Sequence, residues 1–142
     1  MKDTIIDNKI LGYMQIFQKV TRVDVKECLE NEDMILFIVR EHAMAEIFKN
    51  NPDCVSSIRE KTNKHILIAE TSKDLLNYVR NIFFRFGVRE INISWKEGQT
   101  NIQVGVEAME IGKAIGKEGR NVKLFKEAVS RSFNIHSLVI KQ

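Results

Sequence analysis

The residues best suited to chemistry in this chain are a pair of glycines in the stretch "AIGKEGRNVKLF", at residues 114–125. Gly116 and Gly119 enclose two charged residues within a pattern that otherwise predicts helix. A glycine inside a helix costs about 1 kcal/mol relative to alanine, so two of them in one stretch need a reason. Glycines at both ends of a two-residue turn let the main chain approach a ligand that a Cβ atom would hold away.

Positive groups lie beside this turn. We expect the amides at the start of the following helix to point outward with the positive end of the helix dipole, which suits a phosphate. Lys117, Arg120 and Lys123 add positive charge, which outweighs the opposing charge of Glu118. The flanking apolar residues are expected either to anchor the helices to a sheet or to line a groove for bases.

The elements that must position this turn occur in the same order twice. Hydrophobic periodicity predicts helix, strand, strand, helix, helix and strand in residues 1–70, and the same order again in residues 71–142. The predicted strands are 23–30, 34–41, 63–70, 88–95, 100–107 and 135–140. We therefore expect an α+β fold with two αββααβ units, 1–70 and 71–142, packed rigidly together without a flexible linker. A single larger α+β domain is the alternative.

Some element ends are marked by single residues. Ile6 lies on the apolar spacing of the first helix, and Pro52 suits the first turn of a helix at 52–62. Thr71 or Ser72 is the expected cap of a helix at 71–86, and Gly87 suits the position just after its end.

Other single residues carry expectations about burial. Cys28 and Cys54 share no metal-binding spacing and are expected to be buried thiols in a reducing cytoplasm. Met109 is expected in the core. Trp95, which lies just before a turn, is expected to pack or to lie at a sheet edge rather than to stack on RNA bases.

Composition describes a soluble, foldable protein. Hydrophobic residues make up 44% of the 142 residues and charged residues 29%. The longest apolar runs fall far short of the roughly 20 residues that span a membrane, and the amino terminus lacks a signal-peptide core. We therefore expect a cytoplasmic protein. Residues 1–70 carry a net charge of −2 and residues 71–142 a net charge of +5, so the second half is the better candidate for binding a polyanion.

The run "AIGKEGRNV" resembles the signature of the KH RNA-binding domain, in which an apolar residue precedes GxxG and another follows it. The order of elements around the run resembles the type II form of that fold. An ordinary glycine turn between helices is the alternative. The resemblance implies a loop that clamps the backbone of about four single-stranded nucleotides. The candidate RNA-binding residues are Ile111, Ala114, Ile115, Gly116, Lys117, Glu118, Gly119, Arg120, Asn121 and Lys123.

Two type II KH units in tandem, with nothing before or after them, resemble the short archaeal version of the NusA transcription factor. The resemblance covers nearly the whole chain and includes the segments "IFQKVTRVDVKECLEN" and "KLFKEAVSRSFNIHSLVI". It implies binding of single-stranded RNA in transcription elongation, termination or antitermination. RNA polymerase is a further candidate partner, and no membrane or small-molecule substrate is expected.

The first unit departs from this pattern. Its corresponding turn, "IFKNNPDCV", has no glycine, and Phe48 and an asparagine stand where the glycines would be. We therefore assign no GxxG role to residues 48–51. This unit is expected to support the second or to extend its binding platform. Its scattered basic residues could still contact RNA: Arg40, Lys49, Arg59, Lys61 and Lys64.

Other chemistry is not indicated. The three histidines are well separated, and neither a phosphate loop of the GxxxxGK[ST] type nor a GxSxG motif occurs. We therefore expect no metal, no cofactor and no enzymatic activity. The alternative function is a protein-interaction module that docks on RNA polymerase or a ribosome-associated factor and binds little RNA itself.

Overall fold

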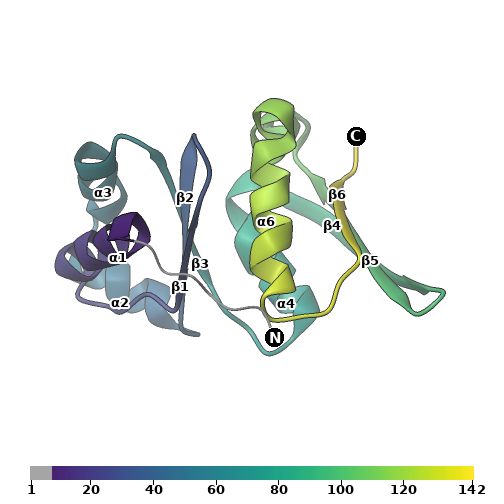
Figure 1. Cartoon of the computed structure of the whole chain (residues 1–142), viewed down its shortest axis with the longest axis horizontal. Coiled ribbons are helices and arrows are strands. Elements are labelled where there is room, and N and C mark those ends of the chain that lie inside the picture. The colour runs from purple at the N-terminus through teal and green to yellow at the C-terminus, as the bar shows by residue number, and fades with distance from the viewer. Residues whose placement is uncertain (1–7) are drawn as a thin grey trace. The chain divides into compact units, whose positions relative to one another are not determined.

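The structure, a computed structural model, describes residues 8–142 (Figure 1). Ile6 lies outside these described residues. The chain divides into two units between Thr71 and Ser72, and each unit has the order αββααβ. Two three-stranded sheets with helices confirm the predicted α+β fold.

Within residues 8–71, the first unit has a three-stranded sheet and three helices, which lie on one side of the sheet (Figure 1). In the sheet order β1-β2-β3, the central strand is antiparallel to β1 and parallel to β3. The elements are α1 (Asn8–Thr21), β1 (Glu27–Glu30), β2 (Met34–Val39), α2 (Ala43–Asn50), α3 (Cys54–Thr62) and β3 (His65–Glu70).

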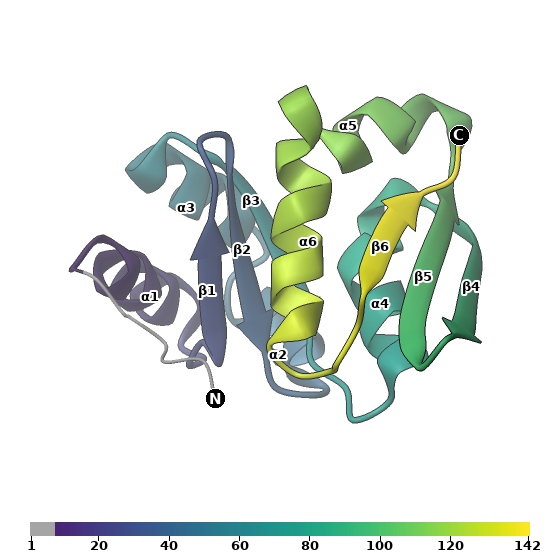
Figure 2. The ribbon, with the colours of Figure 1, turned by 45° about the vertical axis from the view of Figure 1, so that its right-hand side comes forward.

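The second unit repeats this topology with the sheet order β4-β5-β6, in which β5 is antiparallel to β4 and parallel to β6. Figure 2 shows α4 and α6 beside this sheet, and α5 joined to the start of α6. The elements are α4 (Leu75–Phe83), β4 (Val88–Lys96), β5 (Gln99–Val106), α5 (Ile111–Ile115), α6 (Arg120–Ser130) and β6 (Ser137–Ile140).

Each unit has an apolar core between its helices and its sheet. In the first unit, Phe17 of α1 lies against Phe37 of β2, with their ring centroids 4.6 Å apart. In the second unit, Phe125 of α6 meets Phe83 edge to face at 5.0 Å. All four rings are fully buried, and such aromatic pairs add to the stability from burial itself. The core of the second unit thereby fixes α6, which begins directly after the glycine pair.

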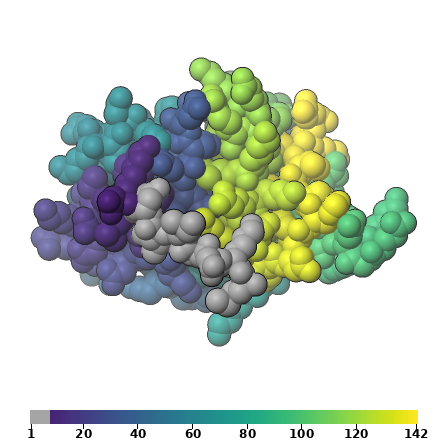
Figure 3. All heavy atoms as spheres, in the orientation of Figure 1, coloured from purple at the N-terminus to yellow at the C-terminus, as the bar shows by residue number. Residues whose placement is uncertain are grey.

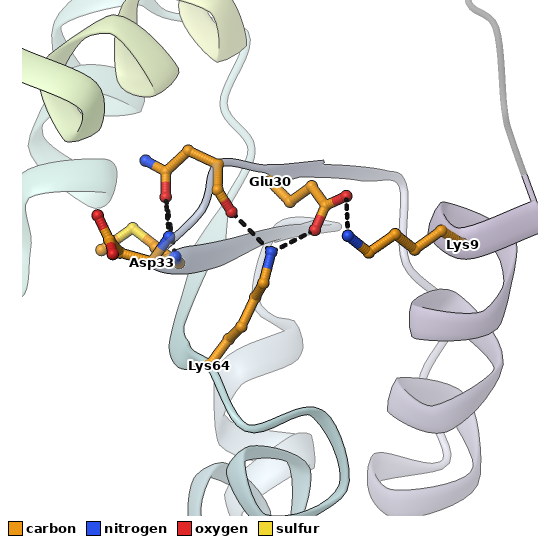
Figure 4. Close-up of polar contacts among 6 residues, drawn as sticks. Lys9, Glu30, Asp33 and Lys64 are labelled. Atoms are coloured by element: carbon orange, nitrogen blue, oxygen red, sulfur yellow. Dashed lines mark hydrogen bonds and ion pairs between the residues drawn. The ribbon is translucent and has the colours of Figure 1, made fainter.

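A cluster of polar contacts around Glu30 lies in the first unit (Figure 4). The Lys64 ammonium donates to a Glu30 carboxylate oxygen at 2.6 Å and to the Asn31 carbonyl at 2.7 Å. Lys9 of α1 lies 3.3 Å from the other Glu30 oxygen. Because Glu30 and Lys64 are mostly buried, this cluster joins α1, β1 and the turn before β3 by charge-assisted hydrogen bonds.

The first strand is shorter than predicted, since β1 begins at Glu27 and not at residue 23. The reason lies at the end of α1. Thr21 Oγ1 donates to the Phe17 carbonyl at 2.8 Å and accepts from the Val23 amide at 3.1 Å. Arg22 has a left-handed φ of 64°, so the chain reverses direction there before it can enter the sheet.

Two predicted helix starts were also wrong. Helix α3 begins at Cys54, so Pro52 lies in the turn before it and not in its first turn. Helix α4 begins at Leu75 and is capped by Asp74, whose carboxylate accepts the Asn77 amide at 3.1 Å. A carboxylate is a strong cap because it also opposes the positive end of the helix dipole.

Burial agrees with the expectations for the cysteines and corrects that for Met109. Cys28 and Cys54 are buried, and neither forms a disulfide within the described residues. Met109 is 93% exposed, so its expected place in the core was wrong. Trp95 lies on edge strand β4, as one alternative predicted, but it is 72% exposed and does not pack in the core.

Candidate nucleic-acid interface

The glycine pair forms a tight bend between α5 and α6 (Figure 2). Helix α5 ends at Ile115, a 3-10 turn covers Lys117–Gly119, and α6 begins at Arg120. The backbone φ angle is positive at Gly116 (76°), Glu118 (55°) and Gly119 (73°). This conformation strongly favours glycine, which explains why two glycines stand in a stretch that otherwise predicts helix.

Gly116 is required by the fold of the bend itself. A Cβ atom on Gly116 would lie 2.7 Å from Asn121 Cγ and 2.9 Å from the Asn121 main-chain nitrogen. The Asn121 side chain is 9% exposed and donates from Nδ2 to the Lys113 carbonyl at 2.9 Å. The prediction that Asn121 contacts RNA therefore needs correction, because its side chain turns inward and ties α6 to α5.

Gly119, in contrast, faces open space. Among residues 8–142, a Cβ atom there would have only Val122 Cγ1 within 4 Å, at 3.9 Å. The main chain at Gly119 is thus bare on the side where a side chain would otherwise project. Of the two glycines, Gly119 is the one that offers close approach to a ligand.

The sequence predicted that the amides at the start of the helix after the bend point outward, but the Arg120 amide at the start of α6 and the Gly119 amide just before it are used within the bend. The Gly119 amide donates to the Gly116 carbonyl at 3.1 Å, and the Arg120 amide donates to the Lys117 carbonyl. These two donors stabilise the 3-10 turn and are not available to a phosphate.

The charged side chains near the bend differ in their exposure to solvent and in their ion pairs. Lys117 and Lys123 are exposed, and Arg120 is half-buried. Glu118 is exposed as well and partly offsets them. On α5, the Lys113 ammonium lies 3.6 Å from a carboxylate oxygen of Glu110. Lys117 and Lys123 are consequently the predicted site cations most open to a polyanion.

The predicted apolar groove residues separate into two kinds. Ile111 and Ile115 are half-buried, so part of each side chain reaches the surface of α5. Ala114 is fully buried, so of the two expected roles it anchors α5 and does not line a groove, and its place among the candidate RNA-binding residues was wrong. Its small side chain lies inside the unit, on the buried side of α5.

This chain is similar to known proteins over its whole length. The family model described as the NusA-like second KH domain matches residues 75–142. A relative from Thermoplasma acidophilum, named "Probable transcription termination protein NusA", is 58% identical over all of this chain and 99% of its own length.

The chain belongs to the archaeal NusA family.

Further relatives match at lower identity. A NusA protein from Halococcus morrhuae, with the same name, is 23% identical over 97% of this chain and 98% of its own length. The crystal structure of APE1850 superposes with a TM-score of 0.68 and 28% sequence identity, over 96% of this chain and 100% of that one. The two αββααβ units described above are thus tandem KH domains of the NusA family.

The first KH unit of this chain has a different turn between its two short helices. Asn50 Nδ2 donates to the Thr21 carbonyl at 3.0 Å, and Asn51 Nδ2 donates to the Val20 carbonyl at 3.3 Å. Both asparagines therefore satisfy carbonyls at the carboxyl end of α1, as a helix end requires. The position that carries the GxxG bend in the second unit is here tied to the body of the domain.

The sequence left undecided whether the basic residues of the first unit contact RNA. Lys64 is removed from that set, because its ammonium is mostly buried and bonded to Glu30. Arg40 pairs with Glu46 at the surface. Lys49 is exposed on α2, next to the turn. The signal that could have excluded Lys64 is its place two residues beyond the end of α3, facing the acidic end of β1.

Two kinds of structure are absent from residues 8–142. No helix in this part of the chain is both long and apolar enough to cross a membrane. The same residues contain no group of three or more His, Cys, Asp and Glu side chains placed to hold a metal ion.

Proposed function

We propose that this NusA family member binds single-stranded RNA at the bend of its second KH domain and acts through that binding in transcription. The observation that carries the proposal is Gly119, whose main chain has a positive φ and open space in front of it. Exposed Lys117 and Lys123 lie on either side of it in the sequence. This combination suits a sugar–phosphate backbone that must come close to the protein main chain.

The contribution of each residue follows from its exposure. Gly119 provides a surface without a side chain, against which the RNA backbone lies. Lys117 and Lys123 neutralise phosphates on either side of that contact. The exposed parts of Ile111 and Ile115 offer apolar surface to bases next to the bend. Gly116 and Asn121 hold the bend in shape and do not touch the RNA.

The names of the relatives support a role for this binding in transcription. The curated relatives carry the name of a transcription termination protein, which supports a role on nascent RNA. RNA polymerase is the further partner we propose, because a termination factor must communicate with the transcribing enzyme. In this proposal the chain binds and carries out no chemical reaction.

The test is the substitution Gly119→Asp, followed by titration of fluorescently labelled single-stranded RNA at low salt. Aspartate tolerates the left-handed conformation, so the fold should survive. The new carboxylate would occupy the open space and repel phosphate, so affinity should fall at least about tenfold. Gly98→Asp is the matched control, because Gly98 also has a positive φ and no atom of the described residues within 4 Å of its Cβ position.

An unchanged RNA affinity in folded Gly119→Asp protein would overturn the proposed site. Circular dichroism of both variants establishes that they are folded. If wild-type protein binds no RNA at low salt but retains RNA polymerase in a pull-down with purified components, the protein-interaction module is the better description.

A further inference from the structure

Strand β4 forms an open edge of the second sheet. In the order β4-β5-β6, it pairs only with β5 among the described residues. Figures 1 and 3 show the β4–β5 hairpin, in green, projecting beyond the helices of its own unit. β4 has nine residues, Val88–Lys96. A long edge strand presents a row of unpaired main-chain groups, which is a template for pairing with another strand.

The hairpin turn determines which main-chain groups face that open edge. Glu97 and Gly98 have φ values of 54° and 76°, and they connect the paired residues Lys96 and Gln99. A two-residue turn with positive φ at both positions is closed by a hydrogen-bonded pair. Because hydrogen-bonded pairs alternate along an antiparallel ladder, Ile91, Ile93 and Trp95 direct their N–H and C=O groups away from β5.

The same residues carry an apolar stripe. Ile91 and Ile93 are half-buried, and Trp95 is 72% exposed. They lie opposite Val104, Ile102 and Thr100 of β5, so they share the face of the sheet on which the helices pack. The other face of β4 carries Glu90 near one end and Lys96 at the other.

We propose that two copies of this chain associate through β4, paired antiparallel with Ile93 opposite Ile93 of the second copy. In this register Ile91 lies opposite Trp95 of the second copy, and Glu90 lies opposite Lys96 of the second copy. By symmetry each of these pairs occurs twice. Opposite charges and apolar side chains placed directly across from each other stabilise an antiparallel pair.

The geometry of the edge selects this register over its neighbours. A residue whose N–H and C=O groups face the open edge must lie opposite a residue of the second copy whose groups also face that edge. The residue opposite Glu90 therefore changes in steps of two along the strand. Centring the pairing on Asn92 places Glu90 opposite Ser94, and centring it on Ser94 places Glu90 opposite Gly98. Neither neighbouring register brings Glu90 opposite a positive charge. The register centred on Ile93 does so at both ends.

The charged residues are available for such contacts. The Glu90 carboxylate accepts from Lys141 at 2.6 Å across Gly105, where a Cβ atom would lie only 2.9 Å from Glu90 Cγ. That contact fixes the Glu90 side chain on its face of the sheet and leaves lone pairs for a second ammonium. Lys96 is exposed at the end of the strand.

A register shift between Val88 and Glu90 marks a bulge that limits regular pairing to residues 90–96.

Because the paired segment is short, we expect a weak and reversible dimer. The test is sedimentation velocity of the full chain from about 1 μM to 1 mM, with the fluorescence of Trp95 recorded over the same range. The chain contains one tryptophan, so this emission reports on β4 alone. Wild-type protein should dimerise with rising concentration, and its emission should shift to shorter wavelength as Trp95 becomes covered.

Charge reversal tests the register. Lys96→Glu places a carboxylate opposite Glu90 of the second copy, and Glu90→Lys places an ammonium opposite Lys96 of the second copy. Each variant alone should raise the dissociation constant about tenfold or more.

An equimolar mixture of the two variants should restore association. In a mixed dimer, Glu90 of the Lys96→Glu copy lies opposite Lys96 of the Glu90→Lys copy. At the other end the two introduced side chains, one acidic and one basic, lie opposite each other. Opposite charges therefore meet at both ends, as in the wild type, and a merely misfolded variant could not be rescued in this way.

Arg85→Glu is the matched control, since it reverses an exposed charge of the same unit outside β4. It should leave association unchanged. A wild-type chain that stays monomeric to about 1 mM overturns the proposal, even if RNA or another protein quenches Trp95 fluorescence. Equal weakening by Arg85→Glu, or failure of the mixture to restore association, overturns it as well.

Discussion

At the scale of single residues, the two glycines of the bend differ in what they do. Gly116 has Asn121 against the place where a Cβ atom would stand, whereas Gly119 has open space. Gly116→Ala should therefore lower the free energy of unfolding by about 3 kcal/mol or more, from backbone strain and overpacking together. Gly119→Ala should cost about 1 kcal/mol, from the left-handed backbone alone. Urea unfolding followed by circular dichroism measures both, and equal costs would contradict the distinction.

This difference marks the limit of what the sequence could predict at the candidate site. Two glycines three residues apart in a helical pattern were enough to predict a bend at which a ligand can approach the main chain closely. They could not indicate which glycine serves the fold, because the constraint on Gly116 comes from an Asn121 side chain that turns back toward Lys113. For the same reason Ala114 could not be assigned, since its burial depends on how α5 lies against the rest of the unit.

At the scale of elements, the cluster around Glu30 joins three parts of the first unit. Burial raises the pKa of Glu30, but hydrogen bonds from Lys64 and Lys9 outweigh it and hold the pKa below its ordinary value. A carboxyl group with a lowered pKa stabilises the folded state above its unfolded pKa. That stability is lost as pH falls through the folded pKa.

Glu30→Gln should accordingly lower the free energy of unfolding of the first unit by about 1 to 3 kcal/mol at neutral pH. The difference from wild type should shrink below about pH 4, where the wild-type carboxyl group becomes protonated. Native-state hydrogen exchange of β2 amides measures this unit separately from the second. Glu60→Gln, at an exposed position of α3, is the control and should change little. A difference that stays constant down to about pH 3 would contradict the assignment.

Element order was predictable because hydrophobic periodicity is repeated in both halves, but element ends were not. β1 begins later than expected because the Thr21 hydroxyl stabilises a chain reversal after α1. Helix α4 begins later because Asp74 competes successfully with Thr71 and Ser72 as its cap. In both cases a local side-chain hydrogen bond determines the residue at which the element begins. The apolar pattern alone is equally compatible with the predicted and the observed start.

At the scale of the whole molecule, the two KH units differ in net charge and in the turn between their two short helices. The positive half of the chain carries the glycine bend, whereas the other half has a net negative charge and a turn tied to α1. Repetition of one fold therefore does not imply two equal RNA sites. The second unit has bare main chain at Gly119 with Lys117 and Lys123 beside it, whereas the corresponding turn of the first has no glycine and Lys49 as its neighbouring cation.

Salt dependence can measure this asymmetry. Each phosphate contacted by a cation contributes about −0.7 to the slope of log affinity against log salt for single-stranded nucleic acid. Lys117→Gln should therefore reduce the slope by about 0.7 and weaken binding at low salt more than at high salt. Lys49→Gln, next to the corresponding turn of the first unit, is the matched control and should leave the slope unchanged. Titrations of one labelled RNA at several salt concentrations measure both slopes. If the two variants reduce the slope equally, the first unit also holds a phosphate, and the RNA path must extend over both KH domains.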